Sequence, residues 1–406
     1  MQNNAKKQSF KRKSANVKVC VGKGNGCPHY KKCGGCHLQN MTYEEQLKYK
    51  QIATIKLLGK FGRVKDIMGM ENPVHYRCKV QAAFGKDKSG IISGVYQSST
   101  HKIVPIDSCM IEDEQADAII VTIRKLLKSF KLKPFDDNNM TGFLRHVLIR
   151  KGYFTGQIMV VLVTGSNLFP SRRSFINALV GRHPEITTIV QNINDKFTSL
   201  VLGEKNITLF GEGWIEDTIF DCAFRISPKS FYQVNPIMTT QLYGKAIEYM
   251  ELTGSETVID AYCGTGTIGI LASRKAGKVI GVELNADAVR DAKFNAKRND
   301  IDNIEFYTAD ASDFMVEMAK AGEKADLVIM DPPRAGSDER FMNSVITLSP
   351  EKVVYVSCNP ETLARDLRYF VRHGYSVRRI QPVDMFPHTN HVETVCMLRK
   401  TQNNSN

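Results

Sequence analysis

The second half of the chain alternates short apolar runs with helical segments, and this alternation constrains the fold more than any other feature. Helices are expected in the intervals between the runs up to residue 372. Such alternation predicts an α/β fold: a Rossmann-like, doubly wound sheet of parallel strands with helices on both faces. The last two runs have no helix between them, so we expect an antiparallel pair at the sheet edge. The predicted strands are 257–262, 278–283, 303–309, 325–330, 351–357, 376–383 and 392–398.

The chain is long enough for several domains. It has 406 residues, 42% of them hydrophobic, which predicts two or three domains with sizeable cores. A helix is expected over residues 42–61, packed on one apolar face. The predicted organisation is a flexible basic arm (1–26), a cysteine-bearing segment followed by a β-rich domain (27–227), the doubly wound domain (228–400) and a tail (401–406).

Charge and apolar patterning indicate the surroundings of the protein. No apolar stretch approaches the length of a membrane span and the amino terminus lacks a hydrophobic signal core, so cytoplasmic residence without membrane contact is expected. The net charge is +13. Residues 1–40 contain no Asp or Glu and carry Lys or Arg at positions 6, 7, 11, 12, 13, 18, 23, 31 and 32. Such a block favours RNA or DNA as a partner, and a solubilising tail is the alternative.

A glycine-rich turn follows the first predicted strand of the doubly wound half. It contains Gly264, Gly266 and Gly269, and Glu283 ends the next strand. Glycines allow close approach of the backbone to a ligand, and an acid at that position can accept hydrogen bonds from ribose hydroxyls. A nucleotide-like cofactor is therefore expected, either a nicotinamide dinucleotide or S-adenosylmethionine.

Two further motifs end neighbouring strands. Asp331-Pro332-Pro333-Arg334 follows the fourth strand and resembles the motif by which methyltransferases grip a planar base. Ser357-Cys358-Asn359-Pro360 follows the fifth, with Asn359 and Pro360 typical of a helix start. A thiol at a helix amino terminus is expected to have an increased thiolate fraction, which suits a nucleophile. The alternative is a buried, inert cysteine.

A cysteine nucleophile solves a particular chemical problem. Carbon 5 of uracil is a poor nucleophile, but a thiolate that adds to carbon 6 makes carbon 5 enolate-like. A base must then remove the proton from carbon 5. Cys358 can supply the thiolate and Glu393 the base.

Together with Phe231-Tyr232-Gln233-Val234-Asn235-Pro236, these residues make the chain resemble the RNA uracil-5-methyltransferase family, most closely the branch that modifies 23S ribosomal RNA. The resemblance implies S-adenosylmethionine as cofactor, Cys358 as nucleophile and Glu393 as base. Gln233 and Asp331 could instead contact the uracil. The implied cofactor-binding residues are Gln233, Tyr262, Thr267, Glu283, Asp310 and Asp331.

The amino-terminal cysteines form a second group. The spacing of Cys27, Cys33 and Cys36, with Cys109 far downstream, permits a four-sulfur metal site. Zinc is one candidate ion, with His29 and His37 as possible substitute ligands. The resemblance implies a 4Fe-4S cluster with a structural role on the four cysteines. The other cysteines outside the Ser357–Pro360 motif are expected to pack as small apolar residues: Cys20, Cys78, Cys222, Cys263 and Cys396.

The expected activity is therefore methylation of carbon 5 of a uridine in 23S ribosomal RNA, with RNA as the partner and no obligate protein partner. The alternatives are a transfer RNA uracil-5-methyltransferase and a catalytically dead, iron-sulfur RNA-binding protein. Residues 1–26 are too few to form the small β-barrel RNA-binding domain with which many relatives begin. The candidate RNA contacts are Arg77, Lys79, Arg145, His146 and Arg150.

Overall fold

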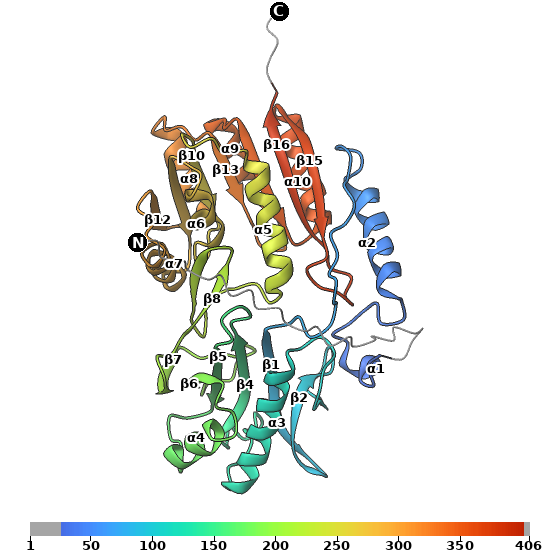
Figure 1. Cartoon of the computed structure of the whole chain (residues 1–406), viewed down its shortest axis with the longest axis vertical. Helices are drawn as coiled ribbons and strands as arrows, with labels where there is room; N and C mark the ends of the chain where they lie inside the picture. Colours follow the sequence, from blue (N-terminus) through green and yellow to red (C-terminus); the bar gives the residue numbers. More distant parts are fainter. Residues whose placement is uncertain (1–25, 402–406) are drawn as a thin grey trace, which may run out of the picture.

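The computed structural model describes residues 26–401, which form two seven-stranded sheets and a two-stranded ribbon. Figure 1 shows the carboxyl-terminal sheet above the first sheet, with the ribbon between them. One apolar cluster includes residues from both sheets, among them Val161 of the first and Ile329 of the second. The two sheets therefore share a core.

The carboxyl-terminal sheet confirms the predicted doubly wound fold. Its order is β12-β11-β10-β13-β14-β16-β15, and the five strands from β12 to β14 are parallel. The last two strands are antiparallel to each other, as predicted, and β16 lies between β14 and β15. The strands are β10 (Thr257–Ala261), β11 (Lys278–Glu283), β12 (Ile304–Thr308), β13 (Leu327–Met330), β14 (Lys352–Ser357), β15 (Tyr375–Val383) and β16 (Glu393–Lys400).

Helices cover both faces of this sheet, which explains why its central strands are continuously apolar. Residues of α5, α6 and α7 pack on one face, and residues of α8, α9 and α10 pack on the other. The helices are α5 (Pro236–Met250), α6 (Thr267–Ser273), α7 (Ala286–Arg298), α8 (Ala311–Lys320), α9 (Glu339–Leu348) and α10 (Pro360–Arg372).

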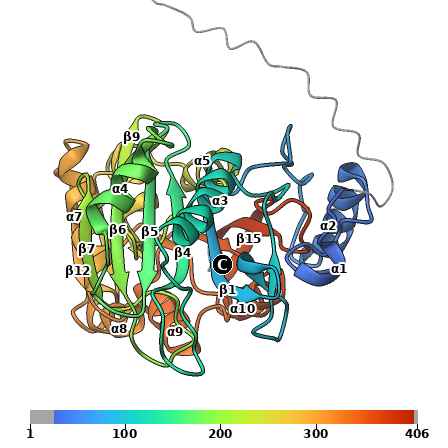
Figure 2. The same cartoon turned by 90° about the horizontal axis from the view of Figure 1, so that it is seen from below.

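The first sheet forms the β-rich part of the chain. It is antiparallel except where β5 and β6 run parallel around the connecting helix α4. Helices α3 and α4 cover one face, as seen from below in Figure 2. The elements are β1 (Lys79–Asp87), β2 (Gly90–Tyr96), β3 (Ile103–Pro105), α3 (Glu114–Ser129), β4 (Leu144–Lys151), β5 (Ile158–Thr164), α4 (Arg172–Val180), β6 (Ile186–Ile193) and β7 (Lys205–Phe210), and the ribbon is β8 (Ile215–Ile219) with β9 (Cys222–Ile226).

The amino-terminal segment crosses to the carboxyl-terminal sheet. Short helix α1 (Tyr30–Cys33) precedes α2 (Tyr43–Leu58), which lies beside β15 and α10 (Figure 1). The predicted helix exists, but the expectation of an apolar packing face was wrong. Its buried residues are Gln46, Lys50, Thr54 and Leu58, whereas the side chains of Tyr49, Ile52 and Ile55 are exposed.

Within residues 26–401, none of the helices combines the length and the apolar character needed to cross a membrane. The basic arm lies almost entirely outside the described residues, as do Cys20 and most of the predicted tail.

Candidate active site

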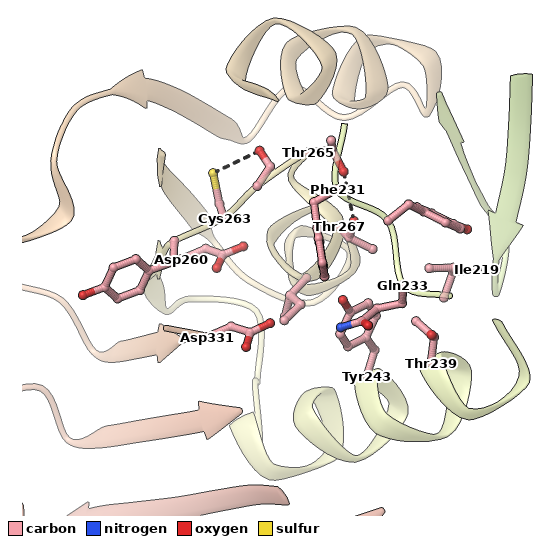
Figure 3. A pocket seen from close by; sticks show the side chains of 14 residues that line it. Ile219, Phe231, Gln233, Thr239, Tyr243, Asp260, Cys263, Thr265, Thr267 and Asp331 are labelled. Atoms are coloured by element: carbon pink, nitrogen blue, oxygen red, sulfur yellow. Dashed lines mark hydrogen bonds between the residues drawn. The ribbon is translucent and has the colours of Figure 1, made fainter. Parts of the chain in front are cut away.

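A cavity opens at the carboxyl ends of the parallel strands of the second sheet. This edge is where open α/β sheets bind ligands. Figure 3 shows Asp260 and Asp331 on one side of the cavity and Phe231 and Gln233 on the other. The remaining lining residues are Ile219, Tyr232, Thr239, Tyr243, Tyr262, Cys263, Gly264, Thr265, Thr267 and Ile268.

The glycine-rich turn builds one wall of this cavity. Gly264 and Gly266 have positive φ angles of 56° and 80°, and a Cβ atom on Gly264 would meet no atom within 4 Å. Tyr262, which is not glycine, also adopts a positive φ of 65°. Non-glycine residues in this conformation are strained and cluster at ligand sites. The turn therefore leaves its backbone open toward the cavity.

Two carboxyl groups line the cavity, those of buried Asp260 and half-buried Asp331. Asp260 accepts a hydrogen bond from the backbone N–H of Gly269 at 2.7 Å. Burial raises the pKa of Asp260 to about 8 and that of Asp331 to about 7. Burial favours the neutral, protonated form of both groups. A cation bound in the cavity would stabilise their negative charges and so favour their ionised forms.

The predicted cofactor residues separate into two sets. Gln233, Tyr262, Thr267 and Asp331 line the cavity, whereas Glu283 and Asp310 do not. Glu283 accepts hydrogen bonds from the backbone N–H groups of Gly264 at 3.1 Å and Asn285 at 2.8 Å, so it supports the turn from outside.

Asp310 acts as the amino-terminal cap of α8. Its carboxylate accepts from the backbone N–H groups of Ser312 at 2.9 Å and Asp313 at 3.1 Å. Sequence reasoning missed Asp260 as a lining residue, although it ends a strand directly before the glycine-rich turn. It also missed Thr239 and Tyr243, which lie on α5 outside any motif.

Cys358 lies in the turn between β14 and α10. The side chain of Asn359 caps α10 by accepting from the backbone N–H of Glu361 at 3.0 Å, and Pro360 is the first helical residue, as predicted. The Asn359 amide also donates to the backbone carbonyl of Arg334 at 3.2 Å. The turn that carries Cys358 is thus tied to the loop that carries Asp331.

The expectation that the helix start would favour the Cys358 thiolate was wrong for the protein without ligands. Burial, with further contributions from the negative charges of Glu393 and Asp331, raises the pKa of Cys358 to about 11. Arg334 and a backbone hydrogen bond act in the opposite direction but do not prevail. The thiol is therefore predominantly protonated at neutral pH.

Glu393 is the first residue of β16, the neighbour of β14. Thr394 pairs with Ser357 across these strands, which places Glu393 and Cys358 at the same end of the pair. The Glu393 side chain is 3% exposed, and burial with the nearby charge of Asp331 raises its pKa to about 8. The negative charges of Asp331 and Glu393 also raise the pKa of Tyr243, which lines the cavity. The charge of Asp331, which lines the cavity, thus affects the pKa values of both Cys358 and Glu393. The Cys358–Glu393 pair therefore lies next to the cavity.

The four predicted metal ligands lie in one region of the molecule without forming a recognisable metal site. Among the residues that the structure describes, no three His, Cys, Asp or Glu side chains are arranged as ligands of one ion. Cys27, Cys33 and Cys36 are close enough for their charges to interact, and burial raises the pKa of Cys33, Cys36 and Cys109. A common neighbour connects the two segments, since the charges of both Cys36 and Cys109 affect the pKa of Tyr76.

Several predicted RNA contacts face inward. Arg145 is buried and donates to the backbone carbonyls of Asn194 and Lys196 at 2.9 and 2.8 Å, and Arg150 donates to those of Ser227 and Ser230 at 2.7 and 2.6 Å. His146 is also buried. These side chains stabilise the β-rich domain instead of offering positive charge on its surface. Arg77 and Lys79 remain partly exposed.

Known proteins resemble this chain in sequence and in fold. The sequence profile of the family described as tRNA (uracil-5-)-methyltransferase matches residues 42–401, which is most of the chain. The chain belongs to this family. It is an RNA methyltransferase.

Relatives and a solved structure agree with this assignment. The chain is 44% identical over 376 residues to an uncharacterised RNA methyltransferase of Clostridium tetani, covering 92% of this chain and 82% of the relative. A similar protein of Halalkalibacterium halodurans is 44% identical over 377 residues, with the same coverage. The crystal structure of Pyrococcus abyssi tRNA (uracil-54, C5)-methyltransferase in complex with S-adenosyl-L-homocysteine superposes with a TM-score of 0.76 at 30% identity, covering 90% of this chain and 85% of that one.

Proposed function

We propose that this protein methylates carbon 5 of a uridine in 23S ribosomal RNA, with S-adenosylmethionine as methyl donor and a covalent adduct on Cys358. The observation that carries the proposal is the placement of Cys358 and Glu393 at the same end of two paired strands, beside the cavity that Asp331 lines. A thiol and a carboxyl group on opposite sides of one base are the two groups that this chemistry requires.

The cavity suits the proposed methyl donor. When bound, S-adenosylmethionine supplies a methyl group on a positively charged sulfur. Within residues 26–401, neither Asp260 nor Asp331 forms an ion pair with a Lys or Arg side chain, and such a ligand would favour the ionised forms of both carboxyl groups. The open backbone at Gly264 leaves room for a ligand to approach, and the S-adenosyl-L-homocysteine complex of the Pyrococcus abyssi enzyme supports the same class of cofactor.

In the proposed reaction, the thiolate of Cys358 forms a bond to carbon 6 of the uracil. The π electrons of the 5,6 double bond move toward the carbonyl at carbon 4, so carbon 5 becomes nucleophilic. Carbon 5 would then bond to the methyl carbon of S-adenosylmethionine as the bond from that carbon to the sulfonium sulfur breaks, and S-adenosylhomocysteine would leave. Glu393 then removes the proton from carbon 5. The electrons of that C–H bond restore the double bond, the bond between sulfur and carbon 6 breaks, and the thiolate of Cys358 is released.

The raised pKa of Glu393 fits the role of a base in a closed site. With a pKa of about 8, a carboxylate binds a proton far more readily than an exposed glutamate does. General bases work best when their pKa lies near the operating pH. The same burial that raises this pKa keeps water away from the adduct.

Two variants test the mechanism. Cys358→Ala is expected to keep cofactor binding and to make no product, because only activation of carbon 5 needs the thiol. Glu393→Gln is expected to add to the base and take up the methyl group, then to stall before proton removal. With radiolabelled methyl donor, denaturing electrophoresis should show a labelled protein–RNA adduct for Glu393→Gln. The double variant Cys358→Ala/Glu393→Gln is the control and should show none. Turnover of Cys358→Ala would refute the nucleophile assignment.

A second candidate substrate is transfer RNA. It is favoured by the description of the matching family and by the Pyrococcus abyssi enzyme, which acts on uracil 54 of transfer RNA. Mapping 5-methyluridine in ribosomal and transfer RNA from a deletion strain separates the two. Loss of one 23S site supports the first candidate, and loss confined to transfer RNA supports the second.

We further propose that Cys27, Cys33, Cys36 and Cys109 hold a 4Fe-4S cluster with a structural role. Soft thiolate donors suit iron-sulfur clusters and zinc, and the buried thiols of this region would ionise more readily beside a metal. Protein purified without oxygen is expected to be brown and to contain about four irons per chain. Stoichiometric zinc without iron would identify the other ion.

A further inference from the structure

The candidate base, Glu393, directly follows a loop that is fixed by hydrogen bonds from distant parts of the chain. Residues 384–392 connect β15 to β16, and the residues that flank this loop, Val383 and Glu393, pair with each other across the two strands. Any displacement of the loop therefore moves Glu393 directly. We call residues 384–392 the base loop.

Five consecutive residues of the base loop, 384–388, make hydrogen bonds to distant parts of the chain. The backbone N–H of Asp384 donates to Met68, and the carbonyls of Met385 and Pro387 accept from Asn235 at 2.8 Å and Tyr76 at 3.0 Å. Four of these five residues are bonded by residues 37–76, which precede the first sheet. The amino-terminal segment thus shapes the loop of the candidate base.

Lys50 makes the strongest of these contacts. Its ammonium group lies 2.6 Å from a carboxylate oxygen of Asp384, and both side chains are 0% exposed. The same ammonium donates to the carbonyl of Phe386 at 3.1 Å, and the Tyr43 hydroxyl donates to the other Asp384 oxygen at 3.0 Å. Lys50 therefore fixes two positions of the base loop at once.

His388 shows how tightly this loop is determined. It adopts a positive φ of 68°, a conformation that costs a non-glycine residue about 1–2 kcal/mol. Its backbone N–H donates to Gln46 at 2.9 Å, and its ring nitrogen Nε2 lies 2.9 Å from the carbonyl of Pro73. The strained conformation persists because its surroundings fix it from several sides.

A buried ion pair is a costly way to stabilise a fold. Removing two charges from water costs several kcal/mol each, and well-packed apolar residues often stabilise a protein equally well. Because the pair joins the buried face of α2 to the base loop, its directional bonds have a consequence that apolar packing would not have: they fix the position of the loop. This points to a role in the reaction.

We propose that Lys50, acting through Asp384, is a positioning residue for Glu393: the buried pair holds the base loop so that the carboxylate of Glu393 stays beside Cys358. This inference rests on the proposed function. The step that it affects is proton removal from carbon 5, since Cys358 is carried by a different turn, which Asn359 ties to the Asp331 loop.

The test removes both charges together. Lys50→Met alone would leave the buried Asp384 carboxylate unpaired and endanger folding, so the main variant is Lys50→Met/Asp384→Asn. We expect it to fold, to keep its KM for S-adenosylmethionine and to lose about tenfold to hundredfold in kcat, as a misplaced catalytic group does. The labelled protein–RNA adduct should accumulate during turnover. Lys48→Met makes the same change at an exposed position of α2 and should behave as wild type.

Three results would decide the matter. A folded double variant that turns over at the wild-type rate, or that loses activity without accumulating adduct, overturns the inference. If the double variant does not fold, Tyr43→Phe replaces it in the test, because this change removes one hydrogen bond to Asp384. Tyr43→Phe must then show a smaller decrease in kcat with some accumulation of adduct. An unchanged kcat without adduct overturns the inference. Glu393→Gln separates the two proposals. If Glu393→Gln accumulates adduct but Lys50→Met/Asp384→Asn does not, only the positioning role is refuted. If neither variant accumulates adduct, the proposed mechanism is refuted.

Discussion

At the scale of single residues, the site is governed by competition between like charges. Burial and the charges of Glu393 and Asp331 keep the Cys358 thiol protonated. In the proposed mechanism, the sulfur of Cys358 carries no charge once it is bonded to carbon 6, so a thiolate no longer opposes ionisation of Glu393. The two groups can therefore act in succession although their negative charges do not favour each other.

This coupling can be measured on the thiol. Because the charge of ionised Glu393 raises the pKa of Cys358, Glu393→Gln should lower that pKa and increase the alkylation rate of Cys358 above about pH 8, where Glu393 is ionised in the wild type. Iodoacetamide labelling followed by mass spectrometry of the Cys358 peptide gives the rate. Cys396, which is fully buried in the same protein, serves as the internal control and should stay unlabelled. If the wild type and Glu393→Gln had the same Cys358 alkylation rate at every pH from 7 to about 9, the two charges would not interact.

At the scale of elements, the start of α10 holds the turn that carries Cys358, the proposed nucleophile. Asn359 makes two contacts with different purposes: it accepts from Glu361 to cap the helix and donates to Arg334 to hold the neighbouring loop. Asn359→Ala removes both contacts and is expected to destabilise the protein by about 1 kcal/mol, as the loss of a cap does.

Asn359→Asp separates these contacts. It keeps the acceptor for the cap but loses the donor to Arg334. We expect its thermal stability to stay close to that of the wild type while kcat falls, because the Cys358 turn is no longer tied to the Asp331 loop. Thermal unfolding and steady-state kinetics of both variants check this. If Asn359→Asp retained full activity, the bond to Arg334 would have no catalytic importance.

Local patterns predict the elements of the second sheet well, and they fail where distant partners decide. The apolar run 351–357 corresponds to β14 (Lys352–Ser357), since a buried parallel strand is marked by its own residues. The packing face of α2 was not predictable in this way. Lys50 is buried because it pairs with Asp384. This partner lies 334 residues away in the sequence, and the periodicity of a helix cannot reveal it.

The candidate site follows the same rule. Residues in motifs at strand ends, such as Asp331 and Cys358, were predicted from their positions, because the topology of a doubly wound sheet brings strand ends together. Tyr243 and Thr239 were missed because they enter the cavity from the middle of a helix. The pKa of Cys358 was mispredicted because a helix start is visible in the sequence, whereas the burial and the two carboxyl groups around it are properties of the folded chain.

At the scale of the whole molecule, three carboxyl groups lie near one another where the cavity meets the base loop: Asp260 and Glu393 are buried, and Asp331 is half-buried. Their pKa values are raised from 3.8 to about 8 for Asp260, from 3.8 to about 7 for Asp331 and from 4.5 to about 8 for Glu393. At a pH between the ordinary pKa of these groups and their raised pKa, the folded state binds more protons than the unfolded state. Linkage then requires the stability of the fold to decrease as the pH rises through this range.

The melting temperature of the protein without ligands is therefore expected to be lower at about pH 8 than at about pH 6. Glu393→Gln should weaken this dependence, because glutamine has no proton to lose and the remaining carboxyl groups lose one negative neighbour. S-adenosyl-L-homocysteine, whose ammonium group is cationic, should raise the melting temperature more at the higher pH, where its charge compensates the ionised carboxylates. A melting temperature that rises from the lower to the higher pH in the wild type would contradict the burial of these groups as protonated acids. The ligand effect would be contradicted if the stabilisation were equal at both pH values, since the cavity would then bind without regard to the charge on Asp260 and Asp331.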